Sequence, residues 1–229
     1  MQWFLANSDY ILRLTSLHLY QSALPLLFGI VLAVPLAQFA RLNRTLATVI
    51  LTTSSILYTV PSLAMFVFLP LVLGTRIISP VNVTVALTIY AVALLVRSTL
   101  DALNSIDDGV RQAAVAMGFT SLRRFFSVDL PLSIPVLFAG LRVISVINIS
   151  MVSVGALIGV SSLGTLFTDG LIRAFPTEIL VGIVMTLVLA LVMDLLLVLA
   201  ERLLTPWART APAPGSQAPG HAARTGVEG

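Results

Sequence analysis

Long apolar runs dominate the chain, and short polar intervals separate them. Five runs come close to or exceed the roughly twenty residues that a helix needs to cross the hydrocarbon of a bilayer. They are residues 19–39, 46–73, 81–96, 132–158 and 178–200. The second run is overlong and contains Pro61 and Pro70, so it predicts a tilted or kinked helix. The pattern therefore predicts an all-α membrane protein with five transmembrane helices, within a membrane domain of residues 19–205.

Three segments outside these runs have a different character. Residues 1–18 mix aromatic and polar side chains, which is typical of a segment lying at the membrane interface. Residues 159–177 contain Gly, Ser and Pro and leave the membrane, with a short interfacial helix over the letters LFTDGLI. The tail, residues 206–229, is rich in Pro, Ala and Gly, so we expect it to be disordered.

Composition excludes several functional classes. With 58% hydrophobic and only 10% charged residues, the chain cannot be a soluble domain, in which about a quarter of residues are charged. The chain has no cysteine, which excludes disulfides, thiolate metal sites and a cysteine nucleophile. His18 and His221 are too far apart in sequence to suggest a metal site, and nothing indicates nucleic-acid binding. The apolar runs contain no nucleophile with a base and no pair of carboxylates, so we expect no enzymatic activity.

The basic residues indicate how the chain is oriented in the membrane. All thirteen are arginines. Arg142 lies inside the fourth span, and with five spans the other twelve fall unequally on the two sides. One side carries Arg41, Arg44, Arg97, Arg111, Arg123, Arg124, Arg202, Arg209 and Arg224, and the other carries Arg13, Arg76 and Arg173. By the positive-inside rule, the loop 97–131 and the C-terminus are cytoplasmic, and the N-terminus is outside. We expect a multi-pass protein of the cell membrane.

The polar interval at residues 105–131 stands out from the rest of the chain. Ser105 followed by two acids predicts the start of a short helix over residues 107–117. Gly118 then suits a left-handed turn, and Thr120 or Ser121 can cap a second short helix. We expect Pro131 to end that second helix. The interval thus predicts a small helix-turn-helix knob on the cytoplasmic side.

This knob resembles the EAA loop of permease subunits of ATP-binding-cassette (ABC) importers. The matching residues are Gln112-Ala113-Ala114, then Gly118, then Leu130-Pro131, with Gln112 where the family usually has Glu. An ordinary cytoplasmic loop that packs on its own helices is the alternative. The resemblance implies a loop that couples the permease to an ATPase through Gln112, Ala113, Ala114, Gly118, Leu122, Arg124, Leu130 and Pro131.

Three further stretches extend the resemblance to permeases of the glycine betaine, carnitine and choline importers. They are TVPSLAMFVFL in the second span, GALIGVSSLG at the end of the fourth, and MDLLLVLAERLLTP in the last. The family implies the type I ABC importer fold, a homo- or heterodimer of permease subunits, separate ATPase subunits and an extracytoplasmic substrate-binding protein. No GxxxxGK[ST] sequence is present, so ATP and Mg²⁺ belong to the partner and no cofactor is expected here. An amino-acid importer and a secondary carrier are the alternatives.

A few polar and aromatic side chains lie within the spans. Arg142 and Asp194 are costly there, and we expect an ion pair, with each other or with Glu201, rather than proton coupling by Asp194. A quaternary ammonium solute favours aromatic faces and neutral dipoles. The candidates for a substrate path are Tyr58, Phe66, Tyr90, Ser145 and Asn148. Packing between helices is the alternative role for each of them.

Overall fold

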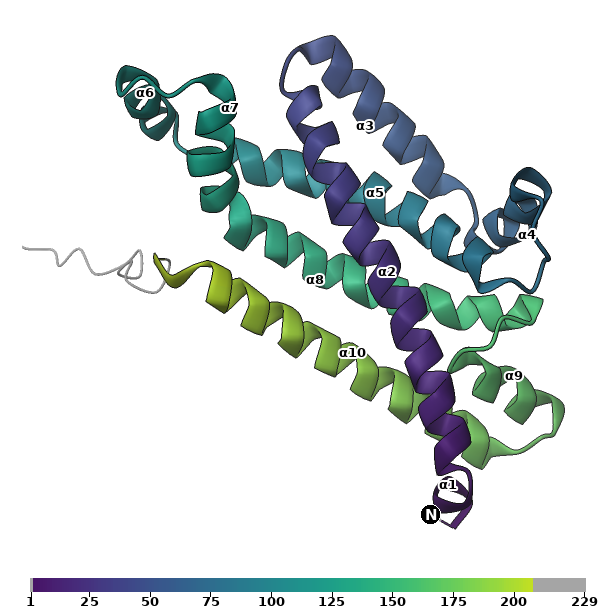
Figure 1. Ribbon diagram of the computed structural model, residues 1–229. Helices are drawn as coiled ribbons and strands as arrows, with labels where there is room; N and C mark the ends of the chain where they lie inside the picture. The colour runs from purple at the N-terminus through teal and green to yellow at the C-terminus, as the bar shows by residue number, and fades with distance from the viewer. Residues whose placement is uncertain (1, 208–229) are drawn as a thin grey trace, which may run out of the picture.

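The computed structural model describes residues 2–207, and all regular structure in this part of the chain is helical (Figure 1). In chain order the elements are α1 (Gln2–Ala6), α2 (Ser8–Ala40), α3 (Arg44–Thr59), α4 (Ser62–Leu73), α5 (Pro80–Asn104), α6 (Asp108–Ala116), α7 (Ser121–Arg124), the π-helical turn η1 (Phe125–Asp129), α8 (Leu130–Val154), the 3₁₀ turn η2 (Gly155–Ile158), α9 (Gly164–Ile172) and α10 (Pro176–Leu204).

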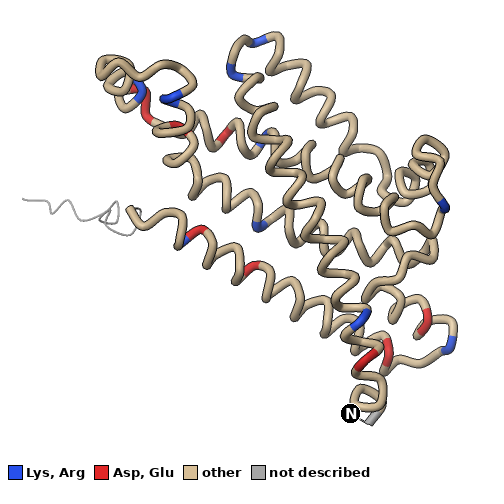
Figure 2. The backbone as a smooth tube through the Cα atoms, viewed as in Figure 1, with Lys and Arg blue, Asp and Glu red and all other residues tan. Residues whose placement is uncertain are grey.

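The prediction of an all-α membrane protein is confirmed. Four helical stretches of the described residues are long and apolar enough to cross a membrane: α2, α5, the stretch 121–158 and α10. The α3–α4 pair, bent by 102°, makes a fifth when it is counted as one broken span. Charged residues cluster at the ends of these helices, with few in between (Figure 2). Most of the tail that we expect to be disordered, residues 208–229, lies outside the described residues.

The first span differs from the prediction at its start. Residues 8–18 do not form a separate interfacial segment, because α2 begins at Ser8 and runs unbroken to Ala40. Ile11 and Leu14 are buried in the protein, so this part of α2 packs on the other helices. Only α1 is set apart, and its Trp3 ring packs in a T-shaped arrangement with the ring of Phe175, which precedes α10. Trp3, which is one of the aromatic residues near the N-terminus, therefore packs within the protein.

The centre of the fold is the crossing of α2 over α5 and α8 (Figure 1). Small residues recur on α2 at every fourth position, at Gly29, Ala33 and Ala37, and the two alanines are fully buried. A Cβ atom added at Gly29 would lie 2.8 Å from the Cβ of Ala91 on α5. Small side chains at this spacing let two helix backbones approach closely, which is a common way to pack helices in membranes. This close packing fixes α2 against α5.

The second span is broken at Pro61, as its sequence predicts. Val60, the residue before the proline, has extended backbone angles (φ −64°, ψ 129°), in keeping with the steric restriction on pre-proline residues. The break frees the Val60 carbonyl from helical hydrogen bonding, and the Tyr90 hydroxyl of α5 donates to it at 2.7 Å. Pro70, in contrast, lies inside α4 and does not end it. The bend is thus stabilised by a contact from a different helix.

Candidate functional site

The predicted knob is present at one end of the helix bundle (Figure 1). Asp107, not Ser105, caps α6, because its side chain accepts a hydrogen bond from the Gly109 N–H at 2.8 Å. Gly118 turns the chain with φ +82°, in the left-handed region, as predicted. Thr120 then caps α7, since its hydroxyl accepts from the Arg123 N–H at 3.4 Å. Two short helices are therefore held at a defined angle by three local features of the sequence.

The outer surface of the knob carries several exposed apolar side chains, although the knob lies at the hydrophilic end of the molecule. Val115, Met117 and Leu122 are exposed, Leu122 to 71%. Gln112 and Ala113 of the EAA-like motif are exposed beside them. A hollow of about 320 Å³ is lined by Arg111, Gln112, Val115, Ala116 and Arg124. Exposed apolar side chains beside a hollow that is itself largely apolar are typical of a surface that another protein covers.

Ala114 has a different position from the other motif residues. It is only 1% exposed, so it faces the protein and not the outer surface of the knob. Its carbonyl accepts the Phe119 N–H at 3.1 Å and closes the turn around Gly118. A small residue is needed at Ala114 because of this internal packing, and the sequence alone does not distinguish it from its exposed neighbour Ala113.

A buried carboxylate anchors the knob to the spans. Asp129 is 1% exposed and is approached by three arginines: Arg41 at 3.2 Å, and Arg111 and Arg124 at 3.7 Å. These arginines come from the end of α2, from α6 and from α7. One carboxylate therefore links both helices of the knob to a membrane span. Its signal in the sequence is weak, because it is a lone acid just before Leu130-Pro131 in a segment rich in arginine.

The prediction that Pro131 ends the second helix of the knob is wrong. After α7 the chain continues through the π-helical turn η1 into α8, and residues 121–158 form one helical stretch. The Leu130 N–H bonds to the Phe125 carbonyl, five residues back, and Pro131 lies in the first turn of α8. The wider π-helical turn shifts the hydrogen-bond register just before Pro131, which has no N–H to donate. The helix can therefore continue through the proline instead of ending at it. Leu130 and Pro131 thus connect the knob directly to a span.

The five candidates for a substrate path do not come together at one surface. Phe66, Tyr90, Ser145 and Asn148 are buried within the protein, and only Tyr58 is exposed, to 41%. Tyr58 packs edge-on against Tyr90, with ring centroids 6.2 Å apart. In this conformation four of the five are therefore enclosed within the protein and line no common surface.

Arg142 and Asp194 form an ion pair between α8 and α10. Arg142 Nε and the Asp194 carboxylate are 2.6 Å apart, and a second bond from the same guanidinium measures 2.9 Å. The expectation that these two charges pair is confirmed. The bidentate contact occupies both oxygens of the carboxylate.

A set of buried polar side chains between α2 and α8 was not predicted from the sequence. His18 bonds the Ile149 carbonyl at 2.9 Å, and the amide nitrogen of Gln21 donates to the Ser161 carbonyl at 2.9 Å. Asn148 lies next to Ile149 in the chain, and neither of its amide atoms has a partner among the described residues. The His18 contact fastens the first span to α8, and the Gln21 contact fastens it to the loop before α9.

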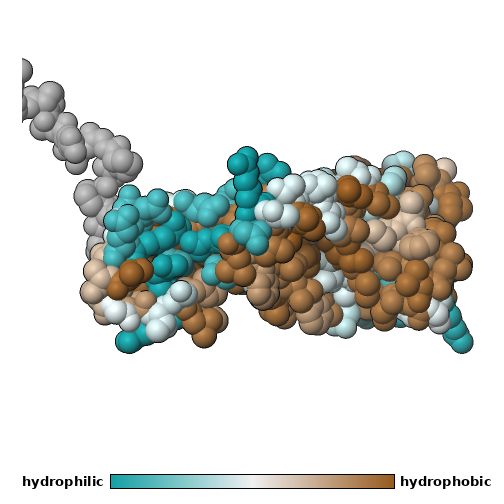
Figure 3. Space-filling view, turned by 90° about the horizontal axis from the view of Figure 1, so that it is seen from above, coloured by the Kyte–Doolittle hydropathy of each residue, from teal (hydrophilic) through white to brown (hydrophobic). Residues whose placement is uncertain are grey.

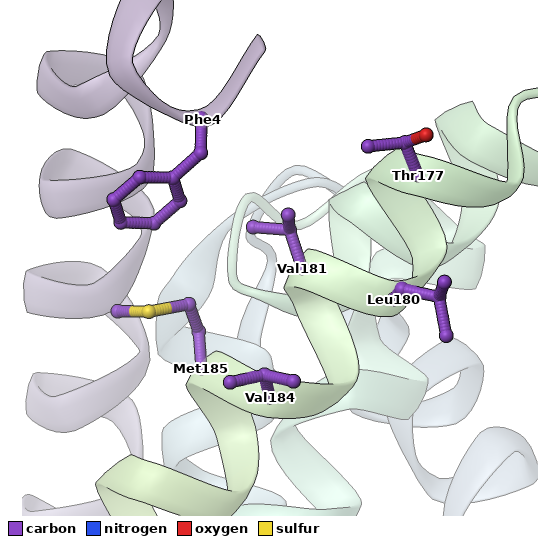
Figure 4. Close-up of a pocket in the computed structure, with 6 residues that line it drawn as sticks. All are labelled: Phe4, Thr177, Leu180, Val181, Val184 and Met185. Carbon is purple, nitrogen blue, oxygen red and sulfur yellow. The ribbon is translucent and has the colours of Figure 1, made fainter. Parts of the chain in front are cut away.

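The opposite end of the molecule has an apolar hollow of about 320 Å³ between α1 and α10 (Figure 4). Phe4 and Met185 face each other across it, and its other lining residues are Thr177, Leu180, Val181 and Val184. With one hydroxyl as its only polar side-chain group, the hollow offers nothing that orients a charged solute.

Comparison with known proteins places the chain among transporters. Residues 26–210 match the family described as binding-protein-dependent transport system inner membrane component. The chain is 33% identical to the osmoprotectant import permease protein OsmW of Salmonella typhimurium, over 90% of this chain and 97% of that protein. It is 31% identical to the choline transport system permease protein OpuBD of Bacillus subtilis, over 90% of each.

Solved structures show the same fold. A chain of the MetNI methionine ABC transporter in an inward-facing conformation matches with a TM-score of 0.76 at 21% identity, over 87% of this chain and 98% of that one. A chain of an amino acid ABC transporter solved with histidines matches with a TM-score of 0.71 at 17% identity, over 87% and 97%. The predicted type I ABC importer permease fold is therefore confirmed.

Proposed function

Since this chain belongs to the family of binding-protein-dependent transport system inner membrane components, we propose that it is the permease subunit of an ABC importer for quaternary ammonium solutes. Glycine betaine, choline and carnitine are the solutes we expect. The permease provides the path through the membrane, and a separate ATPase subunit hydrolyses ATP. The relatives named above, whose names refer to osmoprotectants and choline, support this choice of substrate class.

The observation that carries the proposal is the anchored knob. Its outer face has exposed apolar side chains around Gln112, and its inner side is tied through Asp129 to Arg41 at the end of α2. Its chain continues without a break into α8. A movement imposed on the knob is therefore transmitted to two membrane helices as a rigid displacement.

We assign the exposed residues of the knob to binding of the ATPase. In this role Gln112 and Arg124, together in the hollow, would contact the partner by hydrogen bonds, and Leu122 would enter an apolar cleft. ATP and Mg²⁺ would be held by the partner alone, so this chain needs no catalytic residue and no cofactor. Gln112 keeps the hydrogen-bonding capacity of the more usual glutamate but not its charge.

The arginine distribution supports a cytoplasmic knob and an extracellular N-terminus, where a substrate-binding protein would deliver the solute. A second permease subunit, either this chain or a related one, would complete the path. Because the chain has no cysteine, a single introduced thiol reports its orientation. A cysteine at Ser105 should resist an impermeant thiol reagent in intact cells, and one at Thr75 should react. Reaction at position 105 from outside would reverse the orientation and remove the ATPase from the proposal.

A permanently cationic solute cannot be neutralised by loss of a proton, so a path for it should avoid unpaired carboxylates. Asp194 meets this condition because Arg142 pairs with it. The same pairing argues against a proton-coupled secondary carrier, which needs a carboxylate free to titrate. Of the candidate aromatic rings, Tyr58 alone is exposed in this conformation.

Uptake by cells tests the substrate class. Cells that carry or lack this gene, with the cognate ATPase and binding protein present and under salt stress, are given labelled glycine betaine, choline, carnitine and amino acids. Uptake of at least one quaternary ammonium solute should depend on the gene. Loss of amino-acid uptake alone would assign the chain to an amino-acid importer and leave the importer architecture in place.

A further inference from the structure

A polar pocket of about 400 Å³ lies beside the knob, at the turn between α2 and α3. It is lined by Ala40, Arg41, Asn43, Arg44, Ala47, Leu100, Asn104 and Arg111. Three arginines therefore meet in one hollow at the polar end of the molecule. Figure 3 shows hydrophilic residues gathered at this end and apolar surface over much of the remainder.

The charge of this pocket is only partly compensated. Arg41 pairs with Asp129, and Arg111 pairs with both Asp129 and Asp108. The Arg44 side chain is exposed and has no hydrogen-bond or ion-pair partner among the described residues. The α3 helix begins at Arg44, so the positive end of a sixteen-residue helix adds to the field. The pocket is therefore suited to an anionic group.

An apolar groove continues from the pocket along the seam between α3 and α5. This groove, of about 290 Å³, is lined by Leu51, Ser54, Ser55, Tyr58, Thr59, Ala93, Leu94 and Arg97. On α3 the lining residues of both hollows recur at intervals of three or four, from Ala47 to Leu51 to Ser54 to Tyr58. On α5 they recur in the same way, from Asn104 to Leu100 to Arg97 to Ala93. Both hollows therefore belong to one seam.

The length of the seam matches one leaflet of a bilayer. Ala47 and Tyr58 are eleven positions apart in one continuous helix, which corresponds to about 16 Å of rise. Half of the hydrocarbon core of a bilayer is about 15 Å. A molecule with an anionic head in the pocket and an acyl chain along the groove would fill both hollows.

We propose that this seam is a binding site for an anionic phospholipid, with its phosphate on Arg44 and Arg41. Anionic lipids are concentrated in the cytoplasmic leaflet, where the arginine distribution places the pocket. An acidic segment of the ATPase could also satisfy the arginines. The groove favours a lipid over an acidic protein segment, because it runs from the pocket toward the membrane interior. Its lining residues recur at helical spacing on both α3 and α5, so it follows the seam between these helices. Lipid binding is independent of the proposed transport activity.

The test is a lipid titration of the purified full-length chain in detergent, followed by native mass spectrometry. Phosphatidylglycerol should bind about tenfold more tightly than phosphatidylcholine with the same acyl chains, because charge-assisted contacts to phosphate are lost for the zwitterionic head. Arg44→Gln should abolish this preference. The matched control is Arg76→Gln, which removes another exposed arginine, just before the start of α5, and should preserve the preference.

The groove is tested separately. Ser55→Phe adds a large ring at an exposed position that lines the groove, and it should weaken binding of both lipids. Thr53→Phe, at an exposed position of α3 that does not line the groove, should leave binding unchanged.

Three results would overturn the proposal. The first is a failure to select the anionic lipid: the unmodified chain binds the two lipids equally, or Arg44→Gln leaves binding of phosphatidylglycerol unchanged. The second is displacement of phosphatidylglycerol by glycerol phosphate at equal concentration, which would identify a site for soluble anions only. The third is an Arg44→Gln chain that binds lipid normally but no longer retains the ATPase, which would assign the pocket to the protein partner.

Discussion

Replacing Asp129 by asparagine should disconnect the knob from the membrane helices. The substitution preserves shape and removes the charge that three arginines approach within 4 Å. At an effective dielectric constant of 20, each such pair is worth about 4 kcal/mol of Coulomb attraction. The cost of removing the carboxylate from water offsets most of the attraction summed over the three pairs. Removing one partner of a buried ion pair typically costs about 3–5 kcal/mol of folding stability. The arginines are partly solvated, so we expect the lower end, about 3 kcal/mol.

A loss of that size changes the population of a detached knob by about a hundredfold. ATP hydrolysis by the complex should then no longer respond to the binding protein and solute, although the chain still inserts into the membrane. The measurement is solute-stimulated ATPase activity of the purified complex in nanodiscs, together with its melting temperature in detergent.

Asp108→Asn is the matched control. Asp108 also pairs with Arg111, at 2.8 Å, but its side chain is 82% exposed. An exposed ion pair contributes at most about 1 kcal/mol, so this variant should remain coupled. If Asp129→Asn and Asp108→Asn show the same stimulation and the same melting temperature, the anchoring role of Asp129 is refuted.

Three further substitutions test other contacts. Gly118→Leu should leave the chain inserted but reduce co-purification of the ATPase. A side chain at φ +82° costs about 1–2 kcal/mol, and it would project into space that no other residue of this chain occupies. Full retention of the ATPase would contradict the assignment of the knob to ATPase binding. Arg142→Met alone should lower the melting temperature more than Arg142→Met combined with Asp194→Leu, because the single change leaves an unpaired carboxylate among apolar helices; equal losses would contradict this. Tyr90→Phe should destabilise the chain by about 1 kcal/mol through loss of the hydrogen bond to Val60, measured as thermal unfolding in detergent, whereas an unchanged melting temperature would show that the bend does not need it.

Local features of the fold could be predicted because local interactions determine them. The left-handed turn at Gly118, the cap at Thr120 and the break at Pro61 each depend on residues only a few positions apart. Hydropathy predicts the spans but not the start of α2. Ile11 is buried by helices that come later in the chain, and hydropathy does not indicate that contact.

Contacts between distant segments could not be predicted in this way. Asp129 meets Arg41 across 88 positions of sequence, and nothing in its own neighbourhood identifies that partner. Phe66 and Tyr90 resemble path residues in composition, but whether an aromatic ring faces a path or the interior depends on which helix packs against it. The helix continues past Pro131 because a π-helical turn precedes it, and such a turn has no simple sequence signature.

ATP-driven import of quaternary ammonium solutes can be measured as uptake into proteoliposomes that contain this chain and its ATPase, with the binding protein added on the side of the N-terminus. Labelled glycine betaine, choline or carnitine should accumulate only when ATP and Mg²⁺ are present on the side of the knob. Accumulation driven by a proton or sodium gradient without ATP would contradict the account, as would ATP-driven uptake of amino acids with none of a quaternary ammonium solute.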